Sequence, residues 1–198
     1  SQIFYDCDAL KNVTLGTGIT GIPESAFEDC DVLEELVLPY RVASIGKNAF
    51  KNDVVFKKII IPRATTQIDA TAFSYPGKMT IYGVSGTYAE TFAKENGISF
   101  VSNEVNAANV KLSEEQVTLL NGQSKKLLLT IEPSDFTDEV TWKSSDTNIV
   151  TVDDNGNITA KSIGMATIKV IVGSLSTSCK VTVEQPVTNI WLNKNNVT

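Results

Sequence analysis

The sequence predicts two domains in line, a repeat solenoid followed by an all-β sandwich. Phenylalanine recurs every 23 residues in the first half, which indicates short stacked repeats. The second half consists of strands of alternating apolar residues, separated by Gly, Asn, Asp and Ser turns. Its 198 residues have room for two domains of about 100 residues each. We expect a solenoid over residues 1–104, a sandwich over 105–185 and the first strand of a second, truncated sandwich over 186–198.

The repeats of the first domain share one register. Phe4, Phe27, Phe50 and Phe73 are 23 residues apart. Five further sets of apolar residues keep the same spacing: Leu10, Leu33 and Phe56; Val13, Leu36 and Ile59; Leu15, Leu38 and Ile61; Ile22, Ile45 and Ile68; Ala26, Ala49 and Ala72. Each unit contains a short strand such as ELVLP, a turn, and a helical turn such as PESAF. Because so small a unit cannot bury its own apolar face, neighbours must stack, and we expect the Phe residues to form a ladder in a shared core.

A shortened repeat and a helix are expected to end the solenoid. The fourth unit, KMTIYGV, has lost about three residues before its strand, so that Met79 and Ile81 take the positions of Leu36 and Leu38. In the following stretch, SGTYAETFAKENGISFV, Tyr88, Phe92 and Ala93 have helical spacing. This segment is predicted to be a helix that closes the open end of the solenoid.

The second domain is predicted from eight strands of period two, among them QVTLL, EVTWKSS, ATIKVIV and SCKVTVE. Trp142 is the expected core aromatic residue, and Cys179 is expected in the core of the last strand. A shift of 80 residues places Ile190 on Val110, so the tail TNIWLNKNNVT is predicted to begin the further sandwich.

These motifs carry two family resemblances. The L-x-x-L-x-L strand with its following Pro, the Ala-Phe ending with Cys three residues on, and the terminal helix resemble BspA-like leucine-rich repeats over about residues 1–103. Arg41 stands where the common leucine-rich repeat has Asn or Cys, so a generic Asn ladder is not implied. The W-x-S-S-D, D-x-x-G-x-I-T-A and G-x-A-T-I motifs over residues 107–185 resemble the group 2 bacterial immunoglobulin-like domain of invasin- and intimin-type surface proteins. The first resemblance implies adhesion to host or bacterial surface proteins, and the second implies display at the cell exterior.

Composition argues against several functions. The sequence has no His, which excludes Cys-His and Ser-His-Asp catalysis and His-ligated zinc. Its 17 basic residues against 23 acidic ones, a net charge of −6, provide no basic field for nucleic acid or an anionic membrane. No apolar run approaches the roughly 20 residues of a membrane helix. We therefore expect a non-enzymatic monomer with no catalytic residues, cofactor or metal, and with neither nucleic-acid binding nor direct membrane insertion.

The three cysteines are predicted to be structural. They are odd in number and lack a CxxC motif, so they indicate neither a disulfide framework nor a zinc site. Cys7 and Cys30 follow the 23-residue register, with Asp53 in the third place, which favours buried thiols over a reactive pair. Adjacent rungs are about 5 Å apart, so a disulfide between Cys7 and Cys30 stays open.

Two polar motifs have both a structural and a chemical interpretation. VDDNGN, residues 152–157, lacks the spacing of a calcium loop, which favours a hairpin turn with Asn155-Gly156 at its tip. The acid pairs at 28–29 and 34–35 become Lys-Asn and Lys-Lys one repeat later and fall outside the apolar positions. Solvated surface is therefore favoured over a catalytic acid and base, which would need burial.

One surface is a candidate binding site. Residues between the core positions of each strand must face outward on the solenoid sheet, and stacked repeats use such faces for binding. They form one row of Thr14, Val37, Ile60 and Thr80 beside a second row of Asn12, Glu35, Lys58 and Lys78. Val37 and Ile60 would be adjacent exposed apolar residues, which is consistent with an interaction patch or with ordinary β-strand surface.

The predicted function is that of a non-enzymatic, extracellular adhesin fragment. The solenoid is expected to bind a protein or surface glycan, and the sandwich is expected to act as a stalk. The chain opens SQIFYDCDAL without an initiator Met, so signal and anchor are expected outside this segment of a bacterial surface protein. The alternative is a structural spacer or a non-catalytic accessory module of a large secreted enzyme. An enzyme is the third class, which the lack of an assembled nucleophile and base disfavours.

Overall fold

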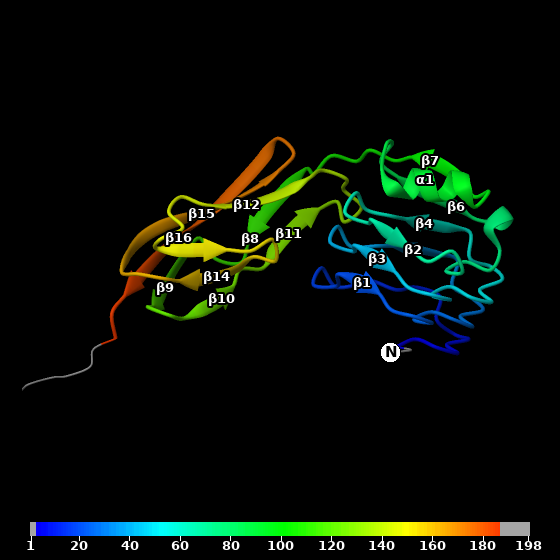
Figure 1. The fold of residues 1–198 in the computed structure, drawn as a ribbon, viewed down its shortest axis with the longest axis horizontal. Helices are drawn as coiled ribbons and strands as arrows, with labels where there is room; N and C mark the ends of the chain where they lie inside the picture. Colours follow the sequence, from blue (N-terminus) through cyan, green and yellow to red (C-terminus); the bar gives the residue numbers. More distant parts are fainter. Residues whose placement is uncertain (1–2, 187–198) are drawn as a thin grey trace, which may run out of the picture. The chain divides into compact units, whose positions relative to one another are not determined.

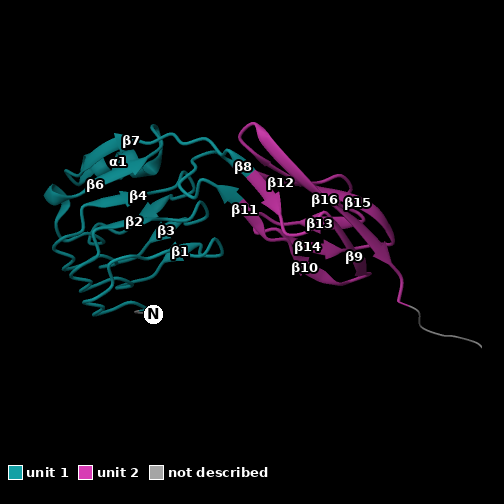
Figure 2. Cartoon of the chain, turned by 180° about the vertical axis from the view of Figure 1, so that it is seen from behind, with its two compact units in different colours: residues 1–109, 131–139 teal, residues 110–130, 140–198 magenta. Residues whose placement is uncertain are grey.

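The computed structural model describes residues 3–186, which divide into two compact units (Figure 2). Unit 1 comprises residues 1–109 and 131–139, and unit 2 comprises residues 110–130 and 140–198. Strands dominate the described part of both units. The strand predicted for the tail lies in residues 187–198, outside the described part, and the predicted domain bounds remain predictions.

Two parallel sheets in unit 1 are built from strands of successive repeats, with β7 from the segment after the helix added to the second sheet (Figure 1). The three-stranded sheet has the order β1-β3-β5, with β1 (Gly21–Ile22), β3 (Ser44–Ile45) and β5 (Gln67–Ile68). The four-stranded sheet has the order β2-β4-β6-β7, with β2 (Glu35–Val37), β4 (Lys58–Ile60), β6 (Thr80–Gly83) and β7 (Ser99–Ser102). Gly21 pairs with Ser44, and Ser44 pairs with Gln67. The 23-residue register read from the sequence is therefore present as strand pairing, with two short strands in each of these repeats.

The helical turn predicted for each repeat is wrong in the described repeats. The segments PESAF and GKNAF form turns and bends instead. Ser25 and Asn48, which occupy the same place in consecutive repeats, have φ angles of +53° and +55°. A right-handed helix requires negative φ at every residue, so the backbone cannot continue as a helix through these positions.

A single hydrophobic core runs through the repeats of unit 1. The rings of Phe4, Phe27, Phe50 and Phe73 stack successively with centroid separations of 5.1, 5.3 and 5.3 Å, and adjacent rings are within 13° of parallel. Inward residues of both sheets, such as Ile45 and Ile59, belong to the same buried cluster. The predicted Phe ladder is confirmed.

Helix α1 (Tyr88–Glu95) packs on the last rung of this ladder. The ring centroid of Phe92 lies 6.3 Å from that of Phe73, and Phe92 and Ala93 are buried, whereas Tyr88 is exposed. The predicted helix is confirmed. Gly97, with φ of +65°, follows the end of the helix in the left-handed conformation that commonly ends helices, and the chain returns as β7.

The fourth repeat has a different alignment from the predicted one. Ile81 pairs with Ile59, which places Ile81 at the position of Leu36. The prediction that Met79 takes this position is wrong by two residues. Thr80 pairs with Lys58 at a step of 22, so only one residue is lost before the strand. The 3₁₀ helix η1 (Pro76–Lys78) occupies the residues before β6 and places Lys78 outside the sheet.

The second segment of unit 1, residues 131–139, is held by buried and hydrogen-bonded residues. Phe136 is buried, with its ring centroid 5.4 Å from that of Tyr40. The main-chain N–H of Thr137 donates to the Val105 carbonyl at 2.7 Å, and the Val105 N–H donates to Thr137 Oγ1 at 2.9 Å. Through these contacts, residues 131–139 belong to unit 1, whereas the sequence predicted them as part of the sandwich.

Unit 2 contains strands of the alternating type. The four-stranded sheet has the order β12-β15-β16-β9, with β12 (Val140–Ser144), β15 (Gly164–Val172), β16 (Leu175–Glu184) and β9 (Gln116–Leu120). The three-stranded sheet has the order β10-β14-β13, with β10 (Ser124–Lys126), β14 (Asn157–Ala160) and β13 (Val150–Val152). Strands β11 (Leu129–Glu132) and β8 (Asn109–Leu112) form a two-stranded sheet, of which residues 109 and 131–132 are counted in unit 1. Trp142 and Cys179 are buried, which confirms their predicted core positions.

The VDDNGN motif forms a hairpin turn between β13 and β14. These strands pair antiparallel, and Gly156 has φ of +75°. Asp153 Oδ1 accepts hydrogen bonds from the main-chain N–H groups of Asn155 and Asn157, both at 2.8 Å. Partial burial acts to raise the pKa of Asp153, but the hydrogen bonds from Asn157 and Asn155 outweigh it and lower the pKa. The hairpin interpretation of this motif is confirmed.

Candidate binding surface

The outward side of the four-stranded sheet of unit 1, here called the β2–β7 face, is built from alternate residues of four strands. Strand alternation sends Leu36, Ile59 and Ile81 into the core and their neighbours to the opposite side. Cross-strand pairing orders these neighbours into one row of Glu35, Lys58, Thr80 and Ser99, and a second row of Val37, Ile60, Tyr82 and Val101.

Five of the eight predicted site residues lie on this face. Asn12 and Thr14 are exposed, but they lie outside the described strands. Lys78 lies in η1, and Thr80 belongs to the row of Glu35 and Lys58 instead of the row of Val37. The place of Lys78 and the row of Thr80 correct the prediction, and the shifted alignment of the fourth repeat explains both. The placement of Asn12 and Thr14 stays a prediction.

Sequence reasoning missed Ser99, Tyr82 and Val101 on this face. Alternation within TIYG and SFVS is the signal that could have found them, once a single residue is deleted in the fourth repeat. Val101 is 42% exposed and therefore offers apolar surface at the end of the second row.

Ile60 is buried, whereas the sequence predicted an exposed side chain at this position. It is only 8% exposed, although it is not a member of the main core cluster. Val37 and Tyr82 lie directly opposite it on the two neighbouring strands, and side chains in such positions are in contact distance. The apolar surface of the face is therefore contributed by Val37, Tyr82 and Val101 and less by Ile60.

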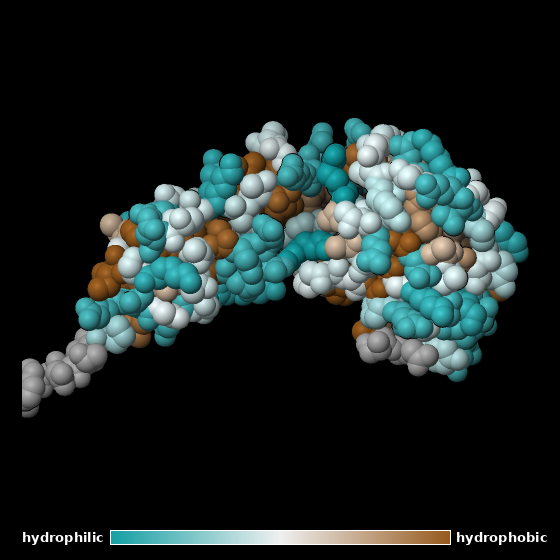
Figure 3. All heavy atoms as spheres, viewed as in Figure 1, coloured by the Kyte–Doolittle hydropathy of each residue, from teal (hydrophilic) through white to brown (hydrophobic). Residues whose placement is uncertain are grey.

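Lys58 lies at the polar centre of the face. Its Nζ atom is 3.1 Å from Glu35 Oε2 and 5.5 Å from the centroid of the Tyr82 ring. The ion pair and the cation–π contact hold the side chain over the sheet. Charged, hydroxyl, aromatic and aliphatic groups thus adjoin on one face. Figure 3 shows that hydrophobic and hydrophilic side chains are interspersed over the side of the molecule in view.

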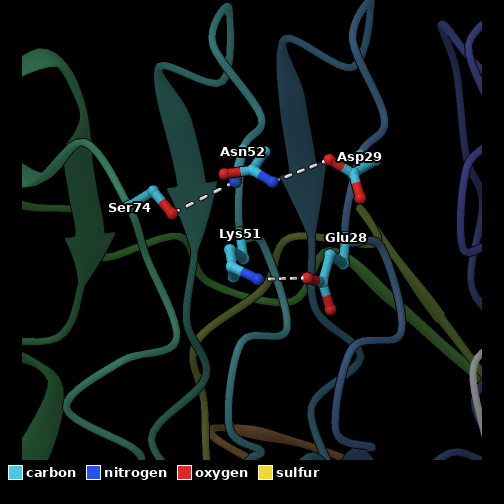
Figure 4. A network of polar contacts seen from close by, with 5 residues as sticks. All are labelled: Glu28, Asp29, Lys51, Asn52 and Ser74. Atoms are coloured by element: carbon cyan, nitrogen blue, oxygen red, sulfur yellow. Dashed lines mark hydrogen bonds and ion pairs between the residues drawn. The ribbon is translucent and has the colours of Figure 1, made fainter.

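A second polar arrangement joins consecutive repeats through side chains 23 residues apart (Figure 4). Lys51 Nζ donates to Glu28 Oε1 at 2.7 Å, and Asn52 Nδ2 donates to Asp29 Oδ1 at 2.8 Å. The Lys51 ammonium holds the pKa of Glu28 below its usual value. Because Glu28 is buried, its predicted place among solvated acids is wrong. Lys57 and Glu34 form a further pair of this kind.

These ion pairs could have been predicted from the sequence, because acidic residues in one repeat are followed by basic residues 23 positions later. Parallel stacking places residue n beside residue n+23, so an acid that becomes a base one repeat later acquires an ion-pair partner. The arrangement explains the two acid pairs as contacts between repeats and gives no support to a catalytic pair.

The buried thiol interpretation is confirmed for Cys30. Cys7 and Cys30 are both free, and Cys7 is half-buried. Cys30 Sγ lies 3.1 Å from the Phe4 carbonyl oxygen, and burial raises the pKa of this thiol to about 11. A thiol held protonated in this way is a poor nucleophile.

Asp53 occupies the rung after Cys30 and is 2% exposed. Its Oδ1 atom accepts a hydrogen bond of 2.8 Å from the Cys30 N–H, whereas Oδ2 has no hydrogen-bond partner among the described residues. Burial raises the pKa of Asp53 to about 7, and the nearby carboxylates Asp29, Asp31 and Glu28 add to this effect. Ionisation of the Asp53 carboxyl group therefore lowers the stability of the folded state.

An apolar depression of about 300 Å³ lies at the first repeat. Its lining includes Ile3, Phe4, Leu15 and Ile19. Phe27, the counterpart of Phe4 one repeat later, is fully buried. The depression therefore exposes core positions of the first repeat and contains no charged side chain.

Residues 3–186 contain neither a metal-binding cluster nor a membrane-spanning helix. No group of three Cys, Asp or Glu side chains there is placed to hold a metal ion. No helix in that part of the chain combines the length and apolar character needed to cross a membrane.

Two family models match the chain. Residues 1–95 match the BspA type leucine rich repeat region in six copies, and residues 106–183 match the bacterial Ig-like domain (group 2). The chain joins a BspA-type leucine-rich repeat region to a group 2 bacterial Ig-like domain. Both resemblances are confirmed in the predicted order, and neither matched family is a catalytic one.

Several curated proteins share parts of this combination. An uncharacterized protein of Clostridium acetobutylicum is 36% identical over 113 residues, which cover 55% of this chain and 11% of that protein. A second uncharacterized protein of the same organism is 46% identical over 69 residues, 33% of this chain and 17% of the relative. The minor capsid protein of Enterobacteria phage T3 is 39% identical over 75 residues, 37% of this chain and 17% of the relative. The chain thus spans a small part of each relative's length.

Solved structures with local likeness contain surface-layer and enzyme modules. Domains 4 and 5 of the S-layer protein SbsC align with a TM-score of 0.34 and 21% identity, covering 43% of this chain and 56% of that one. A bacterial Ig-like domain containing GH10 xylanase from termite gut aligns with a TM-score of 0.29 and 30% identity, covering 34% of this chain and 18% of that one.

Proposed function

We propose that the chain belongs to an extracellular bacterial surface protein that binds a protein or surface glycan through the β2–β7 face. In this proposal the leucine-rich repeat region is a solenoid closed by α1, and the Ig-like domain is a non-catalytic stalk. The succession of the two families supports the assignment to a surface protein.

The observation that carries the proposal is the continuity of the β2–β7 face. Four parallel strands in register place two rows of side chains side by side without interruption. Lys58 is held at the centre by Glu35 and Tyr82, so its charge is presented at a fixed position. A pre-ordered surface of this kind loses little conformational freedom on binding.

The test is a binding screen with the complete 198-residue chain against purified extracellular-matrix proteins and a glycan array. The decisive variant combines Val37→Asp with Val101→Asp. Ile60→Asp is unsuitable because it would bury a charge. The matched control combines Val54→Asp with Val55→Asp, two exposed valines outside the face.

We expect the face variant to weaken binding about tenfold or more and the control to leave it unchanged, because the two new carboxylates would be desolvated without partners at the contact. Equal binding by both variants would show that another surface is used. No binding in the whole screen would favour a structural spacer or an accessory module of a secreted enzyme.

A further inference from the structure

The outward side of the four-stranded sheet of unit 2 contains three lysines on three adjacent strands. Alternation sends Trp142, Val170 and Cys179 inward, and the lysines 143, 169 and 180 are all exposed on the other side. These three lysines, with their neighbours Gln116, Thr167 and Ser178, form a surface that we call the lysine face.

The pairing of these strands brings like charges together. Lys143 on β12 is directly opposite Lys169 on β15. Lys180 on β16 is opposite Thr167 and therefore diagonal to Lys169. Directly opposite side chains on antiparallel strands have Cβ atoms about 5 Å apart, and like charges there are destabilising.

The three lysines are not neutralised within the described part of the chain. The ion pairs formed there involve other lysines, at positions 51, 57, 58, 94 and 125. Two carboxylates lie near the ends of the face: Glu115, whose carbonyl accepts the Lys180 N–H, and Glu184 at the end of β16. The concentration of unpaired positive charge contrasts with the net charge of −6 of the whole chain.

Polar uncharged groups adjoin these lysines. An open depression of about 450 Å³ is lined by Glu115, Gln116, Thr167, Thr177, Ser178 and Lys180. Hydroxyl and amide side chains both donate and accept hydrogen bonds, as sugar hydroxyls do. Among the outward residues of the four strands there is no aromatic side chain on which nucleic-acid bases could stack.

We propose that the lysine face binds an acidic polysaccharide, with the ammonium groups contacting its carboxylate or sulfate groups and the hydroxyl and amide groups contacting its sugar hydroxyls. The ligand would relieve the repulsion between Lys143 and Lys169. This second site lies on a different unit from the β2–β7 face and does not depend on it.

The test measures binding of the complete chain to dextran sulfate and to polygalacturonate by titration calorimetry at low and high salt, with neutral dextran as a reference polymer. The decisive variant is Lys143→Gln, Lys169→Gln and Lys180→Gln together. The control, Lys111→Gln, Lys126→Gln and Lys161→Gln, removes the same charge from exposed lysines outside the face.

We expect the chain to bind both acidic polymers and not dextran. The face variant should weaken binding about tenfold and reduce the dependence of log affinity on log salt by about 2 to 3, because each ammonium contact releases about one counterion. The control should change the affinity less than about twofold, and the face variant should melt at or above the wild-type temperature because repulsion between Lys143 and Lys169 is removed.

Absence of binding to both acidic polymers at low salt would overturn the proposal, as would equal losses in the two variants. Binding of a single-stranded oligonucleotide as tightly as the acidic polymers would also overturn it, in favour of a general polyanion site. A face variant that melts well below the wild type is replaced by Lys169→Gln alone, whose loss of affinity must then exceed that of Lys111→Gln.

Discussion

The two units use polar side chains in different ways. In unit 1 the pairs Glu28–Lys51, Asp29–Asn52 and Glu35–Lys58 each join residues one repeat apart. In unit 2 the turn residues bond to their own neighbours, as Asp153 does to Asn155. Parallel stacking places equivalent repeat positions side by side, whereas antiparallel hairpins leave turn residues close to residues nearby in sequence. Stability should therefore depend on pairs of repeats in unit 1 and on single turns in unit 2.

The largest effect is expected from breaking the Phe ladder. Phe50 stacks on both Phe27 and Phe73, so Phe50→Ala should lower the free energy of unfolding by about 3–5 kcal/mol. Phe4 is only partly buried, so Phe4→Ala should cost clearly less. Urea unfolding followed by circular dichroism measures both, and equal losses would contradict a core built by stacking repeats.

Asp53 should make unit 1 sensitive to pH. Its pKa is raised from 3.8 to about 7 by burial, so between pH of about 4 and about 7 the folded state binds more protons than the unfolded state. Stability is therefore lost as pH rises through this window and is constant above it. Relative to the wild type, Asp53→Asn should gain roughly 2–4 kcal/mol of unfolding free energy between pH 4 and pH 8, since one pKa unit corresponds to about 1.4 kcal/mol.

The measurement for Asp53 is the melting temperature of wild type and variant across this pH range. Asp8→Asn, at an exposed aspartate of unit 1 that does not contribute to the raised pKa of Asp53, is the matched control. A constant difference between wild type and Asp53→Asn at all pH values would contradict the burial of an ionisable carboxyl group at this rung.

A smaller and local effect is expected in unit 2. Asp153→Ala removes the acceptor for the Asn155 and Asn157 N–H groups and should cost about 1 kcal/mol of unfolding free energy. The neighbouring Asp154→Ala should be nearly neutral. Thermal unfolding of the two variants compares them, and equal effects would show that the turn does not depend on Asp153.

The smallest effects are expected from the ion pairs between repeats. The Glu28 side chain is 10% exposed and that of Glu34 is 44% exposed, so Glu28 should couple more strongly to Lys51 than Glu34 couples to Lys57. Double-mutant cycles with Gln replacing Glu and Met replacing Lys give the two coupling energies. The Glu28 coupling should weaken as pH falls through the lowered pKa of Glu28. The reverse order of couplings would contradict the role of burial.

The repeat spacing made most of unit 1 predictable. Phe ladders and strand pairs follow from the recurrence of apolar residues at 23-residue intervals, because equivalent positions must stack. The positive φ angles of Ser25 and Asn48 were not predictable in the same way, because a short segment such as PESAF has ordinary helix formers around them. Local propensity therefore favoured a helical turn that the backbone does not adopt.

The candidate face was only partly predictable. Strand alternation placed Glu35, Val37 and Lys58 correctly, since these strands keep an uninterrupted spacing. The position of Thr80 depended on how many residues η1 absorbs, which alternation alone does not determine. The low exposure of Ile60 depends on the size of Tyr82 beside it, and that contact requires the correct register.

Lysine footprinting with bound ligand tests the central claim most directly. Lys58 on the β2–β7 face and Lys51 at the repeat turns have nearly equal exposed side chains, 40% and 42%. With a ligand identified by the screen bound, acetylation detected by mass spectrometry should slow at Lys58 and remain unchanged at Lys51. Protection of Lys51 with Lys58 still reactive would contradict the proposal that this face binds the partner.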